Sequence, residues 1–251
     1  MDYEKLPTAY WLKQVDRLEA SRAALAARDE VASSGRVIPG APDLVYGTGR
    51  RLRAAVLFLD ISAFSARPSE TQREQDFMLR ILTFFFTEMV RIAEEYGGTV
   101  EKNTGDGLMA YFEDNAGDPP TSGIKRALPC ALTMFYAVQN AVNPVVVRTG
   151  LDAIQFRVGI ETGWITIAKL GAARRFGSIA AVGTTANMAS KMSSFAAPGD
   201  IVIGESAKLG LPIGWQIQFC TRIPGPSGWI YRLSGAEYPF YKYTGRWTGP
   251  R

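Results

Sequence analysis

Two aspartates are the residues of this chain best suited to chemistry. Asp60 ends the apolar run 54–60, and Asp106 lies in the tight turn within residues 100–112. A buried strand that finishes on a carboxylate and a hairpin tip that carries another can bring two hard oxygen donors together, as a pair of Mg²⁺ or Mn²⁺ ions requires. The sequence therefore predicts metal-dependent phosphoryl-transfer chemistry.

Each aspartate also has a simpler explanation when it is taken alone. Asp60 could be a turn former at a strand end or the N-cap of the helix that follows. Asp106 stands in a Thr-Gly-Asp-Gly sequence and could be only a hairpin-turn residue, because Asp-Gly is a strong turn signal. The functional interpretation therefore depends on other segments that accompany the two carboxylates.

The chain contains no histidine and only two cysteines, Cys130 and Cys220. The lack of histidine excludes histidine general bases, histidine-containing serine or cysteine triads, and histidine metal ligands. Two separated cysteines support neither a disulfide framework nor a cysteine zinc site. Any metal ion must therefore be held by oxygen.

The net charge of +4 over 251 residues is mild, and the basic residues are spread along the chain. This distribution fits a small anionic substrate, and we expect no nucleic-acid partner. No window approaches the ~20 uninterrupted apolar residues of a membrane span, and the N-terminus lacks the order of a signal peptide. We therefore expect no membrane partner and a cytoplasmic protein.

The N-terminal part of the sequence predicts an appended helix. Residues 8–32 carry apolar residues at near-heptad spacing beside many charges. Residues 33–42 are rich in turn formers and predict a linker. The expected organisation is a helical extension and linker over residues 1–43, followed by a catalytic domain over residues 44–251.

Residues 44–251 predict alternating strands and helices. The helices are expected over residues 71–96, 123–140 and 184–195. The strands are expected at 54–60, in a hairpin over 99–113, as two short strands around a Thr-Gly turn in 156–168, at 200–204, and as one or two closing strands in the tail. This order favours an α+β fold, a ferredoxin-like mixed sheet with helices on one face.

Four segments resemble motifs of the class III nucleotidyl cyclase catalytic domain. Residues 58–64 are similar to its first metal motif and residues 102–106 to its second. Residues 156–163 match its core hairpin, and residues 182–191 match the start of its transition-state helix. The order and spacing of the four agree with the family, and the likeness covers about residues 50–205.

The resemblance implies a metal site. In it, Asp60 and Asp106 bind two Mg²⁺ or Mn²⁺ ions, and the main-chain carbonyl of Ile61 is a further ligand to one of them. Such ions neutralise a triphosphate and acidify the ribose 3′-hydroxyl, so no histidine base is needed. The loop 61–66 can offer backbone N–H groups to phosphate oxygens, and Phe64 is expected to pack beneath it near the substrate.

The resemblance also implies residues that contact the nucleotide. Asn187 and Lys191 lie four residues apart, so they share one face of the predicted helix. The family position of Asn187 orients the ribose, and that of Lys191 is usually an arginine that stabilises charge on the α-phosphate. A lysine keeps the charge but loses the planar fork of arginine. Arg175 aligns with a position that contacts the triphosphate.

Purine cyclases of this family recognise the base through two positions. The resemblance places these positions at Lys102 and Ala180. The lysine fits an adenylate cyclase, but Ala180 cannot accept a hydrogen bond from the adenine amino group, a loss of roughly 1–3 kcal/mol in discrimination. The carbonyl-rich edge of uracil suits a lysine donor better. The prediction is a uridylate cyclase that resembles the pyrimidine cyclases of bacterial antiphage (Pycsar) systems and makes cyclic UMP, with CTP and ATP as alternative substrates.

The resemblance further implies a homodimer with composite active sites, because the metal aspartates of one subunit meet the Asn and Arg equivalents of the other. A different hypothesis is a catalytically silent nucleotide-binding or dimerisation module, which Lys191 and the lack of a second triphosphate lysine near residues 234–236 would favour. The retained Asp60 and Asp106 argue against loss of activity, because the two carboxylates repel each other without a metal ion.

Overall fold

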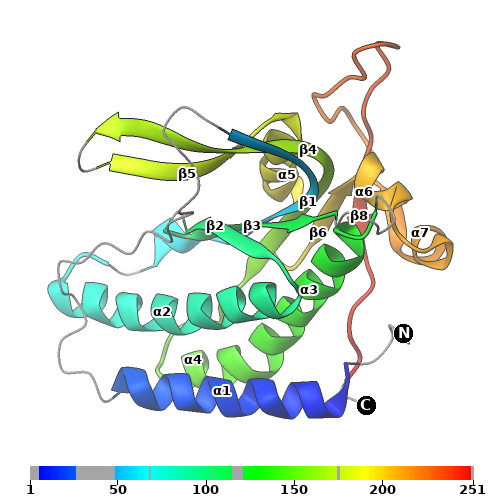
Figure 1. Cartoon of the computed structure of the whole chain (residues 1–251). Helices are drawn as coiled ribbons and strands as arrows, with labels where there is room; N and C mark the ends of the chain where they lie inside the picture. Colours follow the sequence, from blue (N-terminus) through cyan, green and yellow to red (C-terminus); the bar gives the residue numbers. More distant parts are fainter. Residues whose placement is uncertain are drawn as a thin grey trace.

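A mixed sheet of eight strands forms the centre of the structure, a computed structural model that describes residues 6–26, 49–67, 69–103, 105–114, 121–173 and 176–249. Its strand order is β2-β3-β1-β4-β6-β8-β7, and β5 pairs with β4 beside this path (Figure 1). Only β4 and β6 pair in parallel among these strands. The predicted α+β class, with a mixed sheet and an N-terminal helix, is confirmed.

The central strand β1 (Gly49–Ile61) pairs antiparallel with β3 (Gly107–Glu113) on one side and with β4 (Phe156–Ala173) on the other. β2 (Thr99–Asn103) pairs with β3, which confirms the hairpin expected over residues 99–113. Side chains alternate between the two faces of β1. Ala55, Leu57 and Leu59 therefore enter the main core, whereas Ala54 and Val56 enter a smaller cluster on the other face.

The prediction of two short strands in residues 156–168 is wrong, because β4 is continuous for 18 residues. Thr162 and Gly163, taken as a turn, lie in the ladder opposite Ala55 and Ala54. Gly163 instead allows Thr185 to pack closely against β4, because a Cβ at this position would lie 2.5 Å from the Thr185 side-chain oxygen. The outer half of β4 pairs with β5 (Phe176–Val182) and forms a long arm of the sheet (Figure 1).

Two helical runs cover one face of the sheet; the expectation that the helices lie on one face holds for these two and not for the helix at residues 184–195, which packs on the other face. α2 (Gln72–Glu95) begins with a capping box between Thr71 and Glu74. The helix expected over residues 123–140 continues further, as α3 (Ile124–Ala137), the π-helix η2 (Val138–Val142) and α4 (Asn143–Arg148). The run Ile124–Arg148 is apolar and long enough to cross a membrane by length and composition, but half of its most apolar window is buried in the core.

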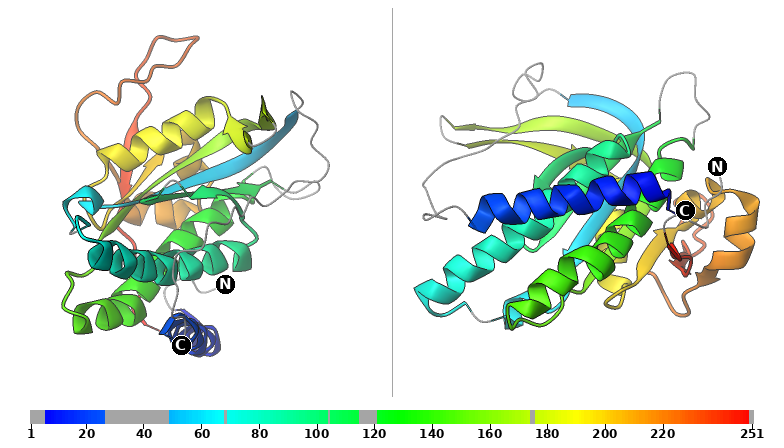
Figure 2. Two further views of the ribbon diagram at one scale, coloured as in Figure 1. Left: turned by 90° about the vertical axis from the view of Figure 1, so that its left-hand side faces the viewer. Right: turned by 90° about the horizontal axis from the view of Figure 1, so that it is seen from below.

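α1 (Thr8–Ala26) forms an outer layer against α2 and η2 (Figure 2). Arg17 donates a 2.8 Å hydrogen bond to the carboxylate of Glu88, which is only 1% exposed. Trp11 packs edge-on against Tyr136 with 4.8 Å between ring centroids. The predicted N-terminal helix is therefore present and docked; residues 27–32 of its expected range and the boundary near residue 43 lie outside the described residues.

α5 (Thr184–Phe195) matches its predicted range and covers the other face of the sheet, where Ala186 and Ala189 pack on the smaller cluster. A Cβ on Gly159 would lie 2.2 Å from the Ala189 carbonyl, so glycine permits this close packing. The remaining elements complete the sheet and its end: η1 (Phe64–Ala66), β6 (Ile201–Gly204), α6 (Glu205–Leu209), α7 (Ile213–Phe219), β7 (Cys220–Arg222) and β8 (Phe240–Tyr243). The two closing strands were expected, but the short helices α6 and α7 were not.

Candidate active site

The fold brings Asp60 and Asp106 together at one end of β1 and β3. Asp60 pairs with Gly107 across the ladder, and the Ile61 N–H donates a 2.8 Å hydrogen bond to the Asp106 carbonyl. Gly105 has φ = 92°, a conformation that glycine adopts without steric cost, so the turn can place Asp106 beside β1. The main chains of the two residues predicted as metal ligands are therefore close together, with Asp60 near the end of β1 and Asp106 in the turn before β3.

Asp60 projects from the α5 face of the sheet. Ala54 and Val56, two residues apart on β1, lie in the cluster under α5, and the alternation of the strand puts Asp60 on the same side. Asp60 lies at the far end of the strand, where its side chain is 28% exposed. The carboxylate is accessible from the face of the sheet that α5 covers only in part.

Arg157 is a candidate site residue that the sequence interpretation missed. It lies opposite Asp60 on β4, where its Nε donates a 2.8 Å hydrogen bond to Asp60 Oδ2 and its Nη2 lies 2.7 Å from the same oxygen in an ion pair. The signal was present in the sequence, because a charged residue interrupts the apolar start of a core strand. The pair places the Arg157 guanidinium within reach of an anionic ligand that binds beside the Asp60 carboxylate.

The loop after β1 forms one wall of a cleft of about 570 Å³ next to Arg157. Ser62 N–H bonds the Gln155 carbonyl at 2.8 Å, and Ala63 adopts a left-handed conformation with φ = 53°. Arg67 donates to the Asp152 and Ala153 carbonyls. These bonds fix the loop, and Phe64 packs against the main core as predicted.

Asn187 and Lys191 lie on the exposed side of α5, one turn apart. The Lys191 ammonium lies 5.6 Å from the centroid of the Phe195 ring, four residues further along α5. Within the described part of the protomer, neither side chain makes a hydrogen bond or ion pair with Asp60 or Asp106. The structure thus leaves these two predicted residues on the surface and does not join them to the carboxylates of the same subunit.

The two base-recognition candidates lie on strands that contact each other. Lys102 belongs to β2, where its backbone pairs with Met109, and Ala180 is half-buried on β5 opposite Ala168. β2 and β5 lie side by side although they do not form a ladder. The Lys102 side chain and Arg175, the predicted triphosphate contact, lie outside what the structure describes.

The donor set at Asp60 and Asp106 suits hard divalent cations. Two carboxylates and the Ile61 carbonyl are oxygen ligands, which Mg²⁺ and Mn²⁺ prefer. No cluster of three or more His, Cys, Asp or Glu side chains occurs among the described residues. The chain alone thus offers few ligands, as is usual for Mg²⁺ sites that share their ion with substrate phosphates.

Comparisons with known proteins show similarity to nucleotide cyclases. A family model described as the adenylate and guanylate cyclase catalytic domain matches residues 49–224. The chain is similar to an adenylate cyclase of Anabaena cylindrica, 26% identical over 160 residues, which cover 61% of this chain and 29% of the relative. It is also similar to a uridylate cyclase of Rhodovulum sp. strain MB263, 25% identical over 169 residues, covering 64% of this chain and 66% of the relative. The chain spans less than two thirds of the length of either relative.

Solved structures share the fold. The crystal structure of the guanylyl cyclase Cya2 has a TM-score of 0.64 at 20% identity and covers 80% of this chain and 95% of its own. The adenylyl cyclase CyaB from P. aeruginosa has a TM-score of 0.63 at 22% identity and covers 78% and 96%. At this identity the likeness supports the fold and not a particular substrate.

Proposed function

The chain belongs to the adenylate and guanylate cyclase catalytic domain family, and from this premise we propose that it is a uridylate cyclase that converts UTP into 3′,5′-cyclic UMP and pyrophosphate. Residues 44–251 form the catalytic domain in this proposal. The observation that carries it is the juxtaposition of Asp60 and Asp106, which the main-chain bond from the Ile61 N–H to the Asp106 carbonyl fixes, with Arg157 paired to Asp60. This arrangement gathers the proposed metal ligands and a phosphate-binding cation at one end of β1, next to the cleft that Arg157 lines.

The reaction is an internal displacement at the α-phosphorus. The ribose 3′-oxygen forms the new bond to the α-phosphorus, the bond to the α,β-bridging oxygen breaks, and pyrophosphate leaves with that electron pair. The 3′-hydroxyl proton passes to solvent. When bound by Asp60, Asp106 and the Ile61 carbonyl, two Mg²⁺ or Mn²⁺ ions neutralise the triphosphate and acidify the 3′-hydroxyl.

The residues around the cleft hold the triphosphate. The guanidinium of Arg157, which pairs with Asp60 in this structure, would also be able to donate hydrogen bonds to a phosphate oxygen of the bound nucleotide. The loop after β1 presents backbone N–H groups next to the same cleft, and Phe64 supports that loop from the core. Arg175, which lies between β4 and β5 in the sequence, is proposed as a further triphosphate contact.

A second subunit supplies the groups that act on the ribose and the α-phosphate. Asn187 orients the ribose, and Lys191 stabilises negative charge on the α-phosphate. Their exposure on α5, together with the accessibility of Asp60 on the same face of the sheet, supports a homodimer with two composite sites. In a head-to-tail pairing of this kind, each subunit contributes its aspartates to one site and its α5 residues to the other.

The choice of UTP rests on Lys102 and Ala180. The contact between β2 and β5 supports a common pocket for these two positions. In that pocket Ala180 cannot accept from an adenine amino group, whereas the carbonyl edge of uracil needs no acceptor from the protein. Similarity to a uridylate cyclase supports this choice, and similarity to an adenylate cyclase keeps ATP, and with it CTP, as alternative substrates.

The biological role in the proposal follows from the product. Cyclic UMP acts in the bacterial cytoplasm as a second messenger of antiphage defence and is read by a separate effector. The alternative function is a module that binds nucleotide without turning it over. It is favoured by Lys191, because a lysine cannot bind the α-phosphate through two parallel hydrogen bonds as an arginine can.

An assay with ATP, CTP, GTP and UTP, each with Mn²⁺, tests the function directly. Chromatography with mass spectrometry should find cyclic UMP as the dominant product. Cyclic AMP as the dominant product would overturn the pyrimidine assignment. Calorimetric binding of UTP with no product from any of the four nucleotides would favour the silent module, provided that the protein is dimeric in the assay.

A further inference from the structure

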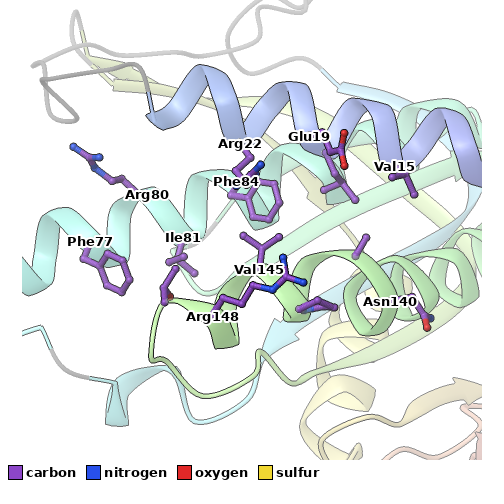
Figure 3. A pocket seen from close by; sticks show the side chains of 14 residues that line it. Val15, Glu19, Arg22, Phe77, Arg80, Ile81, Phe84, Asn140, Val145 and Arg148 are labelled. Carbon is purple, nitrogen blue, oxygen red and sulfur yellow. The ribbon is translucent and has the colours of Figure 1, made fainter.

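A second pocket lies between α1, α2 and the η2–α4 segment, on the side of the sheet that α2 and α3 cover (Figure 3). Its volume is about 480 Å³. This size falls within the roughly 300–1,000 Å³ of sites that bind small molecules. The pocket shares no lining residue with the cleft next to Arg157.

The inner walls of the pocket are apolar. Figure 3 shows the rings of Phe77 and Phe84 from α2, with Ile81 between them, facing Val145 from α4. Leu18 of α1 lines the same hollow. Such walls can remove the apolar body of a ligand from water, which is the main source of affinity in small-molecule sites.

The rim of the pocket is positively charged. Arg22, Arg80 and Arg148 line it, against a single carboxylate, Glu19. Figure 3 shows Arg22 and Arg148 directed toward the hollow from α1 and α4. Neither of these two arginines forms an ion pair with another residue in the described ranges. Two guanidinium groups that converge over an apolar hollow favour a ligand with an anionic head group.

The floor of the pocket contains an unusual backbone segment. Asn140 and Ala141 line the hollow and belong to the π-helix Val138–Val142. π-helical turns are rare and frequently occur at functional sites, because they are less favourable than a regular α-helix and re-aim the side chains they carry. This feature supports a binding role independently of the charges on the rim.

We propose that this pocket binds a small amphipathic anion, with its apolar body between α2 and α4 and its carboxylate between Arg22 and Arg148. α1 supplies one wall, so the ligand contacts α1 and α2 together. Anything that binds only the docked arrangement stabilises it by mass action. The ligand therefore also strengthens the attachment of α1 to the catalytic domain.

Decanoate is a suitable probe, because it combines a flexible apolar chain with one carboxylate. Isothermal titration calorimetry on the full chain should detect saturable binding below the aggregation concentration of decanoate, and decanoate should raise the melting temperature. Decanol and decyltrimethylammonium have the same chain without the anionic head and should bind at least tenfold more weakly. Equal binding of decanol would overturn the assignment of an anion site.

Three variants locate the binding. The double variant Arg22→Gln/Arg148→Gln should bind decanoate at least tenfold more weakly. The double variant Arg73→Gln/Lys125→Gln removes two exposed positive charges outside the pocket and should bind as the wild type does. Val145→Trp fills the hollow without changing charge and should abolish binding.

Circular dichroism confirms that each variant is folded before its titration is interpreted. Wild-type affinity in the folded Arg22/Arg148 double variant would contradict the proposal, and so would undiminished binding to folded Val145→Trp. These readouts measure binding and not cyclase activity, so they stand or fall separately from the proposed function.

Discussion

The Arg157 guanidinium forms an ion pair with one carboxylate oxygen of Asp60: Nε donates a 2.8 Å hydrogen bond to Oδ2, and Nη2 lies 2.7 Å from the same oxygen. The pair links β4 to β1 at the point where the main chain of Ile61 bonds that of Asp106. A candidate metal ligand and a candidate phosphate ligand therefore share one position. Under the proposed function, Arg157 is expected to position Asp60 and to contact the triphosphate.

Replacement of Arg157 should weaken triphosphate binding. Arg157→Gln is expected to raise KM and to lower kcat/KM by about 100-fold, because a charge-assisted bond to phosphate is lost. Arg157→Lys should recover part of the loss, since it keeps the charge without the fork. Steady-state kinetics with UTP and Mn²⁺ give KM and kcat/KM for both variants. Arg73→Gln, at an exposed arginine, is the control. An unchanged KM in Arg157→Gln would contradict the role.

Replacement of Asp60 should remove metal-dependent activity without unfolding the protein. Asp60→Asn is expected to lower kcat at least 1,000-fold, on the order of what loss of a metal that stabilises transition-state charge costs. Calorimetric titration with Mn²⁺ should show weaker binding, and the partly exposed position of Asp60 at the end of β1 should leave the melting temperature nearly unchanged. Asp76→Asn on the exposed side of α2 is the matched control. Full activity in Asp60→Asn would exclude the metal site.

Mixed dimers should regain activity if the active sites are shared between subunits. Asp60→Ala and Lys191→Ala proteins should each be nearly inactive alone. Random mixing gives half heterodimers, each with one intact site of two, so about a quarter of the wild-type activity should return. Native mass spectrometry verifies subunit exchange. If exchange is complete and no activity returns, each site lies within one subunit.

Substitution at Ala180 should change base preference. Ala180→Asp introduces the acceptor that an adenine amino group needs, and the ratio of kcat/KM for ATP to that for UTP should rise about tenfold. Ala180→Leu adds bulk without an acceptor and should not produce this rise. Competition assays with both nucleotides give the ratio directly. No change in Ala180→Asp would remove Ala180 from the base pocket.

Glu161 should make stability depend on pH. Burial of this side chain at the β4–α6 contact raises its pKa from 4.5 to about 7, although Oε1 accepts hydrogen bonds from Thr162 and Ala207 N–H groups. A raised pKa in the folded state means that the folded protein holds the proton more tightly. The contribution of Glu161 is therefore complete below pH 4.5 and is lost as pH rises to about 7, by about 3 kcal/mol.

The comparison of wild type with Glu161→Gln isolates this effect, because glutamine keeps the acceptor oxygen and carries no charge. Denaturant unfolding at pH 4.5, 6 and 8 should show that the wild type loses stability relative to the variant as the pH rises. A constant difference between the two proteins across this range would show that Glu161 does not titrate with a raised pKa.

Local signals in the sequence predicted most individual elements. Thr71 and Glu74 mark the start of α2 through a capping box, and Gly183 precedes the start of α5. Signals of this kind act within one helical turn, so they can be recognised without knowledge of the fold. The same approach failed for Thr162 and Gly163, where a turn-like pair lies inside a continuous strand because β1 and α5 hold it straight.

The candidate site was predictable only in part. Asp60 and Asp106 were identifiable because their types and flanking residues match a pattern for metal binding. Arg157 was missed, since its importance depends on the residue opposite it in another strand, 97 positions away along the chain. The pocket between α1 and α4 was missed for the same reason, because its walls come from three separate helices.

The sequence by itself determined the chemical repertoire: oxygen ligands without histidine, the positions of the two carboxylates, and the residues of the helix that carries Asn187 and Lys191. Only the tertiary structure decided which of these groups meet within one protomer and which remain exposed. The physical reason is that residue type and local periodicity are properties of a segment. The register of strand pairing and the packing of helices on a sheet depend on contacts between segments that are distant in the chain.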